Sequence, residues 1–540
     1  MTTILLYSSD PQCWVEALRW SRTHGIANAC WVILTSPEEG VPIAQDLGLL
    51  SADAVEKCAF FSMPGIHRMP AVLGNILWVR LPERSWRREL HFKADLIVVS
   101  HPGELTALQR FAHQETEVLG LNRESLPPFI ETKAQRLRFK NARPNLPFKP
   151  VKEVAIVGAG LAGAMVAYEL GKKGVPVTVV DESPVPGGAA SALYAGLFHP
   201  HWQATDSPLF RLTRLGFRLL QPLMEDFPDC FIPCGVFDMA TDEVEYSKWK
   251  EHYALEKPLP LPRDFGELVN VESASSLVGT EVKRGGWWFP SAGLVHAGKL
   301  AKRLLESVHA RVLMNQKVSL KREGSKWTLY PPQGGALVKS EHVVVAAAMG
   351  IPELMSLSRE ALGLSPLKGR ISLLSAAPQG LGGALAMTGV GYLVKVGEHF
   401  AAVGATYEPE HQAWSTQEAH THNWSALLGL LSEKQCQGIV PAGFYQGVRA
   451  VCLDRLPLVG QGFTAKTLQS CHFAGRPELE KLPVEEGLWV CGAFGSRGLT
   501  WGLACADHLA SLMLGEPSVL EYSLSQALHP GRFIAERFRK

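Results

Sequence analysis

The sequence shows no strong excess of charge and no long apolar run. Its 540 residues carry 53 Lys and Arg against 52 Asp and Glu, so any surface for a polyanion must be local. No apolar run reaches the roughly 18 residues that a membrane-spanning helix needs. The start at Met1–Leu6 has no basic segment of the kind that opens a secretory signal. We therefore expect a cytoplasmic protein with no membrane contact.

The sequence is also poor in paired cysteines. Ten cysteines are scattered along the chain, and only Cys230 and Cys234 stand close together. No second pair and no histidine cluster accompanies them, so a zinc site is not completed. We expect reduced thiols and no metal ion.

The strongest pattern that is present lies between Val154 and Asp181. An apolar run, Val154–Val157, meets a glycine-rich turn, an alanine-rich stretch to Lys173 follows, and a second apolar run, Val175–Val180, ends at Asp181. This order predicts a βαβ unit that binds a dinucleotide. The pattern by itself does not separate FAD from NAD.

Each glycine of that turn has its own task. Gly158 permits the tight turn, Gly160 lets the backbone approach a pyrophosphate, and Gly163 lets the helix pack on the strand. The start of the helix offers free N–H groups and the positive end of its dipole to phosphates. Asp181 stands where a ribose hydroxyl needs an acceptor.

A second glycine-rich turn lies more than 300 residues further on. The strand Leu488–Cys491 leads into this turn, 492–502, and a helix is expected over Leu503–Leu514. Alone, such a turn is ordinary, but paired with the first it predicts a second contact with a flavin. The residues expected at this contact are Gly492, Gly495, Ser496, Gly498, Leu499 and Thr500.

About 150 residues precede the βαβ unit, and their pattern is α/β. Four short apolar runs predict strands, at Ile4–Tyr7, Cys30–Leu34, Ile76–Val79 and Leu96–Val99. Helices are expected over Trp14–Thr23 and Leu105–His113. We expect an N-terminal domain over residues 1–132, whose role the sequence does not give.

A basic segment then joins this domain to the rest. Between Lys133 and Lys152 there are seven Lys or Arg, no acid, and prolines at 144, 147 and 150. The composition predicts a linker over residues 133–150, and its charge serves either solvation alone or contact with phosphates.

Further strands are expected between the two glycine-rich turns. A hairpin is predicted at Lys317–Leu320 and Trp327–Tyr330, a buried strand at His342–Ala347, and a strand pair at Tyr392–Val396 and Ala401–Gly404.

Several motifs together resemble the D-amino-acid oxidase and glycine oxidase superfamily of FAD amine oxidases. They are the βαβ unit, the segment 186–191, the strand at 342–350, the segment 447–460 and the turn 492–502. Three details, at 195–200, 448–460 and 495–500, resemble the oxidase domain of the bifunctional tRNA modification family MnmC. The resemblance covers about 390 residues, from 151 to 540.

The resemblance implies a fold class and an activity. The fold is α/β (α+β overall), with a Rossmann-type FAD-binding domain and an inserted antiparallel-sheet substrate domain. The activity is FAD-dependent oxidation of the carboxymethylaminomethyl group on the wobble uridine of tRNA. Glyoxylate leaves and aminomethyl uridine remains. The partner is then tRNA, at its anticodon region.

The family also implies a methyltransferase domain ahead of the oxidase, and here the sequence departs from it. Residues 1–150 are shorter than that domain and lack its glycine-rich turn, since Leu5–Asp10 reads LLYSSD. We therefore do not carry methyl transfer over, and a separate methyltransferase becomes a possible partner.

The resemblance also points to residues that meet the substrate. Arg449 matches the position that binds substrate carboxylate, and Tyr392 matches a tyrosine that shares the contact. Arg497 lies within reach of the carboxylate or the flavin carbonyls, and His199 lies in a stretch beneath the ring. Lys395 is a weaker candidate of the same kind. For each residue the alternative is a structural role in packing or an ion pair.

Cofactor contacts are implied at several more positions. These are Gly188, Ala190 and Ser191 after the βαβ unit, Val318 at the adenine edge, and Gly350 at the end of the 342–350 strand.

An aromatic run at Trp287–Pro290 has two interpretations. Core packing is the simpler one, and a platform for a flipped base is the other. A basic approach to the flavin is expected from Lys133–Lys152 and from Lys283 with Arg284.

Two other functions stay open. One is a small-molecule oxidase or dehydrogenase of the glycine or D-amino-acid type, which needs a small closed pocket and no basic approach. The other is a flavin-bearing tRNA-binding protein without catalysis.

Overall fold

The computed structural model divides into two compact units. One unit comprises residues 1–150 with 511–525, and the other comprises 151–510 with 526–540. The structure describes six strands of residues 1–150, and beyond them 151–200, 202–203, 207–254, 265–378, 381, 384–397, 400–412, 414–469, 473 and 475–538.

The N-terminal unit contains a six-stranded sheet in the order β3-β4-β2-β1-β5-β6. All neighbours pair in parallel except β3 and β4. The strands are β1 (Thr2–Tyr7), β2 (Ala29–Thr35), β3 (Gly65–Met69), β4 (Asn75–Arg80), β5 (Ala94–Val99) and β6 (Ala112–Gly120). The four strands expected from the sequence are confirmed, with β3 and β6 in addition.

Two helices were expected in this region, and the structure tests only part of one of them. Trp14–Thr23 lies outside the described residues. The expected helix Leu105–His113 is wrong at its end, because β6 begins at Ala112 and pairs in parallel with β5. The rest of that helix also lies outside the described residues. Sheet pairing there overrides the local helical pattern.

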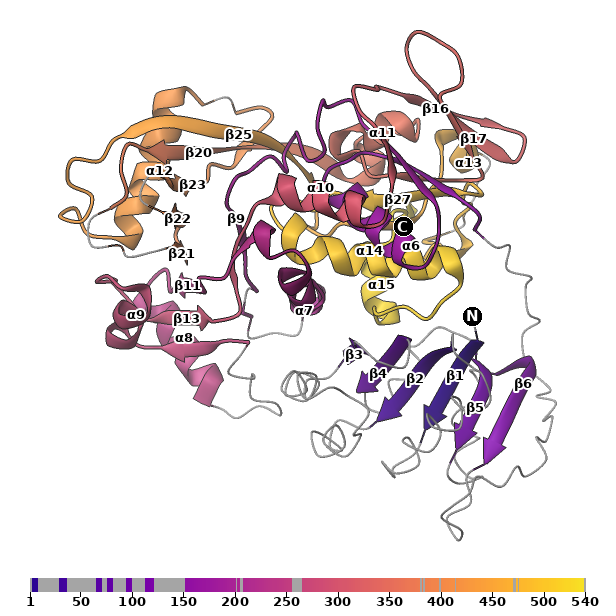
Figure 1. Ribbon diagram of the computed structural model, residues 1–540, viewed down its shortest axis with the longest axis horizontal. Coiled ribbons are helices and arrows are strands. Elements are labelled where there is room, and N and C mark those ends of the chain that lie inside the picture. Colours follow the sequence, from indigo (N-terminus) through magenta and orange to yellow (C-terminus); the bar gives the residue numbers. More distant parts are fainter. Residues whose placement is uncertain are drawn as a thin grey trace. The chain divides into compact units, whose positions relative to one another are not determined.

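The larger unit is built around a six-stranded sheet in the order β15-β8-β7-β19-β27-β26, of which Figure 1 labels β27. Its neighbours pair in parallel except β26 and β27. Its strands are β7 (Val154–Val157), β8 (Val177–Val180), β15 (Arg311–Leu313), β19 (His342–Val345), β26 (Leu458–Gln461) and β27 (Leu488–Gly492). The βαβ unit is confirmed, and its second strand begins two residues later than expected.

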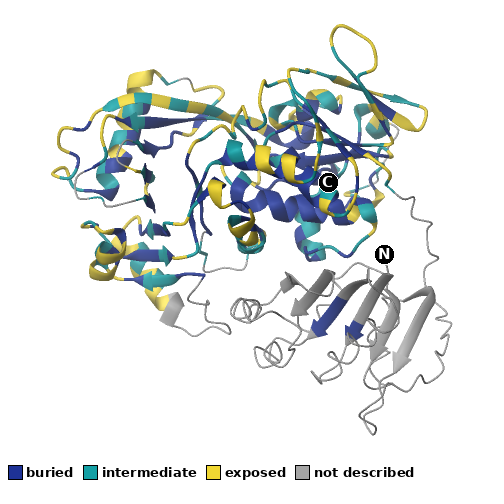
Figure 2. Cartoon of the chain, in the orientation of Figure 1, coloured by how far each residue is buried: buried dark blue, intermediate teal, exposed yellow. Residues whose placement is uncertain are grey.

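Three long helices accompany this sheet. They are α6 (Leu161–Lys172), α10 (Ala297–Ser307) and α14 (Gly498–Leu514). In Figure 2, α14 is dark blue over most of its length, which matches the burial of nearly all its residues up to 510. A helix that is apolar all round belongs inside a protein, and α14 is the central helix of this unit.

The start of α14 differs from the sequence prediction. The helix was expected from Leu503 but begins at Gly498, so Gly502 lies inside it. Glycine weakens an isolated helix by about 1 kcal/mol relative to alanine, which is why the sequence pattern delays the start. Close packing outweighs this cost, because a Cβ on Gly502 would lie 2.4 Å from the Met165 sulfur.

The substrate subdomain is a nine-stranded, mostly antiparallel sheet. Its order is β12-β13-β11-β21-β22-β23-β20-β24, with β25 also paired to β20. The strands are β11 (Val236–Met239), β12 (Glu267–Val269), β13 (Gly286–Phe289), β20 (Leu364–Leu374), β21 (Leu385–Thr388), β22 (Tyr392–Val396), β23 (Phe400–Gly404), β24 (Glu408–Pro409) and β25 (Pro441–Cys452). The expected pair of β22 and β23 is confirmed, and the antiparallel substrate domain with it.

Two small sheets complete the unit. One is the predicted hairpin with a third strand, β16 (Ser319–Glu323), β17 (Lys326–Tyr330) and β18 (Val338–Ser340). The other is β9 (Gly196–Phe198), β10 (Phe231–Ile232) and β14 (Gly293–Val295). The expected strand His342–Ala347 stops at Val345, where a 3₁₀ turn follows at Ala348–Gly350.

The remaining helices of the described residues are shorter or lie between the sheets' strands in sequence. They are α7 (Pro208–Asp226), α8 (Glu243–Ala254), α9 (Val271–Val278), α11 (Ile351–Leu354), α12 (Thr416–Leu430), α13 (Ala465–Gln469), α15 (Tyr522–Leu528) and α16 (Arg532–Arg537). A capping box at Ser415 and Glu418 fixes the start of α12, which contacts β20, β22 and β23.

Candidate active site

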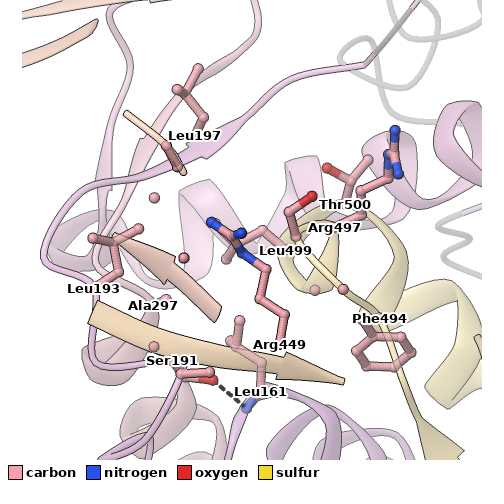
Figure 3. A pocket seen from close by; sticks show the side chains of 18 of the residues that line it. Leu161, Ser191, Leu193, Leu197, Ala297, Arg449, Phe494, Arg497, Leu499 and Thr500 are labelled. Atoms are coloured by element: carbon pink, nitrogen blue, oxygen red, sulfur yellow. Dashed lines mark hydrogen bonds between the residues drawn. The ribbon is translucent and has the colours of Figure 1, made fainter. Parts of the chain in front are cut away.

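The two glycine-rich turns and the substrate subdomain line one cavity of about 630 Å³. Gly160 comes from the first turn, Ser496 from the second, and Arg449 from β25. Figure 3 shows the labelled side chains converging on this space from the three parts of the unit. The carboxyl ends of β7 and β27 lead into the two turns, which is where ligands bind in sheets of this kind.

The first turn is shaped by packing at two glycines and open at the third. A Cβ on Gly163 would lie 1.8 Å from the Gly158 oxygen, and a Cβ on Gly158 would lie 2.4 Å from the Ala346 oxygen. Gly158 also has a φ of +117°, which favours glycine. Gly160 meets only the Ser191 hydroxyl, at 3.5 Å, and it alone of the three lines the cavity.

The start of α6 presents backbone donors to the cavity. The N-cap residue of α6 is Gly160, which has no side chain to cap the helix. The Leu161 N–H donates to Ser191 Oγ at 3.3 Å (Figure 3). At the end of β8, the Asp181 carboxylate accepts from the N–H groups of Ala159, at 2.6 Å, and Ser183, at 2.7 Å. A carboxylate has lone pairs left for a ribose hydroxyl, so this arrangement fits a dinucleotide.

The second turn adds donors opposite the first. Ala493 and Gly495 have φ angles of +62° and +59°, and they reverse the chain between β27 and α14. The Gly495 N–H donates to the Ala450 oxygen at 3.0 Å, which ties the turn to β25. All six residues expected here line the cavity: Gly492, Gly495, Ser496, Gly498, Leu499 and Thr500.

Arg449 carries a positive charge into the cavity without an acidic partner. Its Nη1 donates to the Thr406 oxygen at 3.3 Å, and its Cζ lies 4.9 Å from the centroid of the Tyr407 ring. Among the described residues no carboxylate lies within ion-pair distance of it. A half-buried guanidinium of this kind is suited to a carboxylate ligand, which it binds with two parallel hydrogen bonds.

Tyr392 lines the same cavity at the start of β22. Burial raises the pKa of its phenol well above the ordinary value, and the nearby charge of Arg449 opposes that shift only in part. The phenol is therefore protonated and can donate a hydrogen bond to an anion.

Arg497 belongs to the second turn and directly precedes α14. Burial lowers the pKa of its guanidinium, its Nε has no partner among the described residues, and its Cζ lies 5.1 Å from the Trp501 ring centroid. In Figure 3 the guanidinium groups of Arg449 and Arg497 point apart. Both residues line the cavity, but they face different parts of it.

His199 lines the cavity as a buried side chain. Its Nδ1 lies 2.9 Å from the Pro200 oxygen. Burial, together with the charge of Arg497, lowers the pKa of the imidazole to about 4. The ring is neutral near pH 7, so His199 adds no charge beside a bound ligand.

Several expected contacts lie outside the lining of the cavity. Ala190 and Ser191 line it, while Gly188 does not. Val318 packs partly buried against the core beside β16, and Gly350 ends the 3₁₀ turn of which Ala348 lines the cavity. Lys395 is buried in β22 and does not line the cavity.

Two residues of the aromatic run on β13, Trp287 and Phe289, belong to the core. Trp287 is fully buried and stacks on Trp202, with ring centroids 5.0 Å apart. The platform interpretation is therefore wrong for Trp287, because a stacking surface must be open on one face. Arg284 donates from Nε to the Ala240 oxygen at 2.7 Å, and Lys283 donates to the Leu428 oxygen.

The expected basic approach to the flavin is thus not found at Lys283 and Arg284, since neither lines the cavity. The linker 133–150 lies outside the described residues.

Four further residues at the cavity carry no local signal in the sequence. Gly369, Tyr407, His422 and Tyr445 line it, and the Tyr445 hydroxyl donates to the Ala189 oxygen at 3.0 Å. Gly369 and Tyr445 lie on the paired strands β20 and β25, Tyr407 follows β23, and His422 lies on α12, so neither spacing nor motif indicates them.

Among the described residues we find neither a metal-binding cluster nor a membrane-spanning helix. No group of three or more His, Cys, Asp or Glu side chains there could hold a metal ion. Both Cys230 and Cys234 are free thiols, and burial raises the pKa of each to about 11. No described helix is long and apolar enough to cross a membrane.

The fold and the cavity define a flavoprotein of the oxidoreductase class. The family model described as "FAD dependent oxidoreductase" matches residues 153–512, and the chain belongs to this family. Its cofactor is FAD, and the glycine turns, the Asp181 carboxylate and the start of α6 fit that dinucleotide.

Relatives with known names extend the comparison. The chain is 32% identical over 411 residues to the tRNA 5-methylaminomethyl-2-thiouridine biosynthesis bifunctional protein MnmC of Ralstonia nicotianae, covering 73% of this chain and 62% of that protein. It is 31% identical over 392 residues to the MnmC protein of Azoarcus sp., covering 71% of this chain and 60% of that protein. The match thus spans about three fifths of these relatives.

Solved structures share the fold. Glycine oxidase from Geobacillus kaustophilus superposes with a TM-score of 0.56 at 21% identity, over 70% of this chain and 98% of that chain. L-proline dehydrogenase from P. horikoshii has a TM-score of 0.56 at 17% identity, over 73% of this chain and 100% of that chain.

Proposed function

We propose that this FAD-dependent oxidoreductase oxidises the carboxymethylaminomethyl group on the wobble uridine of tRNA. Glyoxylate leaves, and aminomethyl uridine remains on the RNA. The observation that carries the proposal is Arg449, a guanidinium in the flavin cavity with no carboxylate beside it among the described residues. The names of the relatives supply the RNA context.

The roles of the side chains follow from their charges. Arg449 binds the substrate carboxylate, and the protonated phenol of Tyr392 donates a second hydrogen bond to it. His199 is neutral and adds no charge to the site. These contacts orient the methylene of the substrate for reaction, which is the main contribution that positioning makes.

The proposed reaction consumes one two-electron oxidant and one water molecule. FAD held at the two glycine-rich turns would supply the two-electron oxidant that removes a hydride from the methylene between the carboxylate and the secondary amine. The nitrogen lone pair forms the C=N bond of the resulting iminium ion, water adds to its carbon, and the C–N bond then breaks. Glyoxylate carries the oxidised carbon away, and the primary amine stays on the uridine.

We further propose how the chain is organised and which partners it has. Residues 151–540 form the oxidoreductase, 133–150 a basic linker, and 1–132 a separate α/β domain. The substrate is the anticodon region of tRNA, so the protein acts in the cytoplasm. A separate methyltransferase is the expected partner for the next step.

A nucleoside analysis tests the proposal. Purified holoprotein is incubated with tRNA from cells that accumulate carboxymethylaminomethyl uridine, and the digested nucleosides are measured by mass spectrometry. We expect conversion to aminomethyl uridine with one equivalent of glyoxylate, and an Arg449→Ala variant that keeps its FAD should convert at least tenfold less. Unchanged tRNA in the wild-type reaction would contradict the proposal.

The same samples distinguish the alternatives. A small-molecule oxidase of the glycine or D-amino-acid type would leave the tRNA unchanged and oxidise a free amino acid. A non-catalytic flavoprotein would bind tRNA and reduce its flavin with neither substrate. Binding through phosphates would weaken steeply with salt, which binding of a free amino acid would not.

A further inference from the structure

Tyr407 is an exposed aromatic ring at the mouth of the flavin cavity. It lies between β23 and β24 and lines the cavity, yet 54% of it is exposed. Val390 and Val448 line the same cavity and are 45% and 48% exposed. Single exposed apolar residues are ordinary, but three at one cavity mouth indicate a surface that a ligand covers.

The residues on either side of Tyr407 hold it in place. Thr406 donates its hydroxyl to Glu408 at 2.6 Å, and Glu408, which is 1% exposed, pairs with Arg370 at 3.3 Å. Arg370 in turn donates to the backbone oxygens of Trp414 and Ser415. The backbone at Tyr407 is therefore fixed from both sides, and its ring is ready for a partner before that partner arrives.

Tyr407 and Arg449 are in contact at the cavity, so a ligand bound by Arg449 lies next to Tyr407. The Arg449 Cζ lies 4.9 Å from the ring centroid of Tyr407. In a carboxymethylaminomethyl uridine, four bonds separate the carboxylate carbon from the pyrimidine ring, about 5 Å when extended. One molecule can thus place its carboxylate on Arg449 and its pyrimidine ring beside Tyr407.

We propose that Tyr407 is the platform on which the pyrimidine ring of the modified uridine stacks, and that it selects a nucleoside substrate over a free amino acid. This inference rests on the proposed function. A free glycine ends at its amine and has no group that reaches Tyr407. The ring of His422, which is exposed and lines the same cavity, stands at the same mouth.

The test compares three variants of the full-length holoprotein. Tyr407→Ala removes the ring, Tyr407→Phe keeps it, and Tyr194→Ala removes an equally exposed aromatic that packs on His296 and Phe400. For modified tRNA we expect KM to rise roughly tenfold to hundredfold in Tyr407→Ala, the range of one base-stacking contact. Tyr407→Phe and Tyr194→Ala should stay within about threefold of wild type.

A second measurement separates stacking from an effect on Arg449. Glycolate carries a carboxylate and no pyrimidine, so its inhibition constant against tRNA oxidation reports on the carboxylate site formed by Arg449 and Tyr392. We expect this constant to change less than threefold in Tyr407→Ala, because Arg449 keeps its bond to Thr406. An equal loss of glycolate and tRNA binding would overturn the platform role.

The outcomes also separate this inference from the proposed function. Wild-type oxidation of tRNA with an unchanged KM in Tyr407→Ala would overturn the platform and leave the function standing. Failure of the wild type to oxidise tRNA would overturn both.

Discussion

The guanidinium of Arg449 lies directly across Gly369. A Cβ on Gly369 would come within 2.4 Å of Arg449 Cζ, Nη1 and Nη2. Gly369 belongs to β20, which pairs with β25 on one side and with β24 on the other. The arginine therefore crosses the middle strand over a residue that has no side chain, and it reaches Thr406 and Tyr407 beyond it.

This relationship predicts the effect of one methyl group. Gly369→Ala should displace the Arg449 guanidinium and raise KM for the substrate at least tenfold, because a charge-assisted bidentate contact is lost. Gly443→Ala is the matched control on β25, since its Cβ would meet only Leu373, at 3.8 Å. Steady-state kinetics of the two variants, with FAD content as a check, measure the difference. Equal kinetics in both variants would mean that Arg449 does not bind substrate from this position.

Tyr392 supplies a second prediction at the same cavity. Because burial raises the pKa of its phenol, the hydroxyl stays protonated and donates throughout the neutral range. Tyr392→Phe should raise KM by about tenfold to 150-fold, the effect of one hydrogen bond to a charged group, and leave the pH profile between 6 and 9 unchanged. A loss that appears only above pH 8 would instead show that the phenol titrates there.

The glycines of the first turn predict two different failures. Gly163→Ala places a Cβ 1.8 Å from the Gly158 oxygen, which outweighs the gain of about 1 kcal/mol in helix propensity. This variant should lower the melting temperature of the protein even without FAD. Gly160→Ala has room for its Cβ and should fold, but its methyl group stands in the cavity and should weaken FAD binding at least tenfold.

Melting of the FAD-free variants, followed by titration with FAD, distinguishes these effects. A Gly160→Ala protein that binds FAD as tightly as wild type would contradict the placement of the pyrophosphate at this turn.

Buried histidines predict how stability depends on pH. Burial lowers the pKa of His199, His508 and His529 to about 4 from an ordinary value of 6.5. Between these values the unfolded chain binds protons that the folded protein does not, so each histidine makes stability fall as the pH falls from 6.5 toward 4. Asp238 acts in the opposite sense, because burial raises its pKa from 3.8 to about 7.

Three histidines against one carboxyl give a net gain of stability as the pH rises from about 4.5 to 6.5. Urea unfolding in buffer saturated with FAD measures this slope. In Asp238→Asn the opposing carboxyl is absent, so the slope should be steeper than in wild type. A stability that is flat or falls over this range would contradict the burial of the histidines.

The sequence alone predicted the parts of the fold that are formed by residues close together in the chain. The βαβ unit from Val154 to Asp181 is continuous in the chain. Gly163 is required by a contact with Gly158, and Gly158 by its positive φ and by the approach of Ala346 after β19. The strands β22 and β23 are likewise neighbours in sequence and in space. Periodicity and turn residues are sufficient for such elements.

The features that the sequence did not predict depend on contacts between residues far apart in the chain. The start of α14 at Gly498 is set by packing on Met165, more than 300 residues away. Gly369 and Tyr407 gain their roles only when β20 pairs with β24 and β25, and the resemblance that indicated Arg449 did not extend to them. Trp287 is a residue type that can stack on a base, and only its burial shows that it belongs to the core.

The central claim is that the flavin of this protein takes its electrons from a modified tRNA. The most direct measurement is anaerobic reduction of the yellow holoprotein, followed at the flavin absorbance band. The substrates offered in turn are tRNA bearing carboxymethylaminomethyl uridine, glycine, sarcosine and D-amino acids. The account predicts bleaching by the tRNA with release of glyoxylate, and none at a comparable rate by the free amino acids. Bleaching by a free amino acid at an equal or higher rate would contradict it and leave a small-molecule amine oxidase.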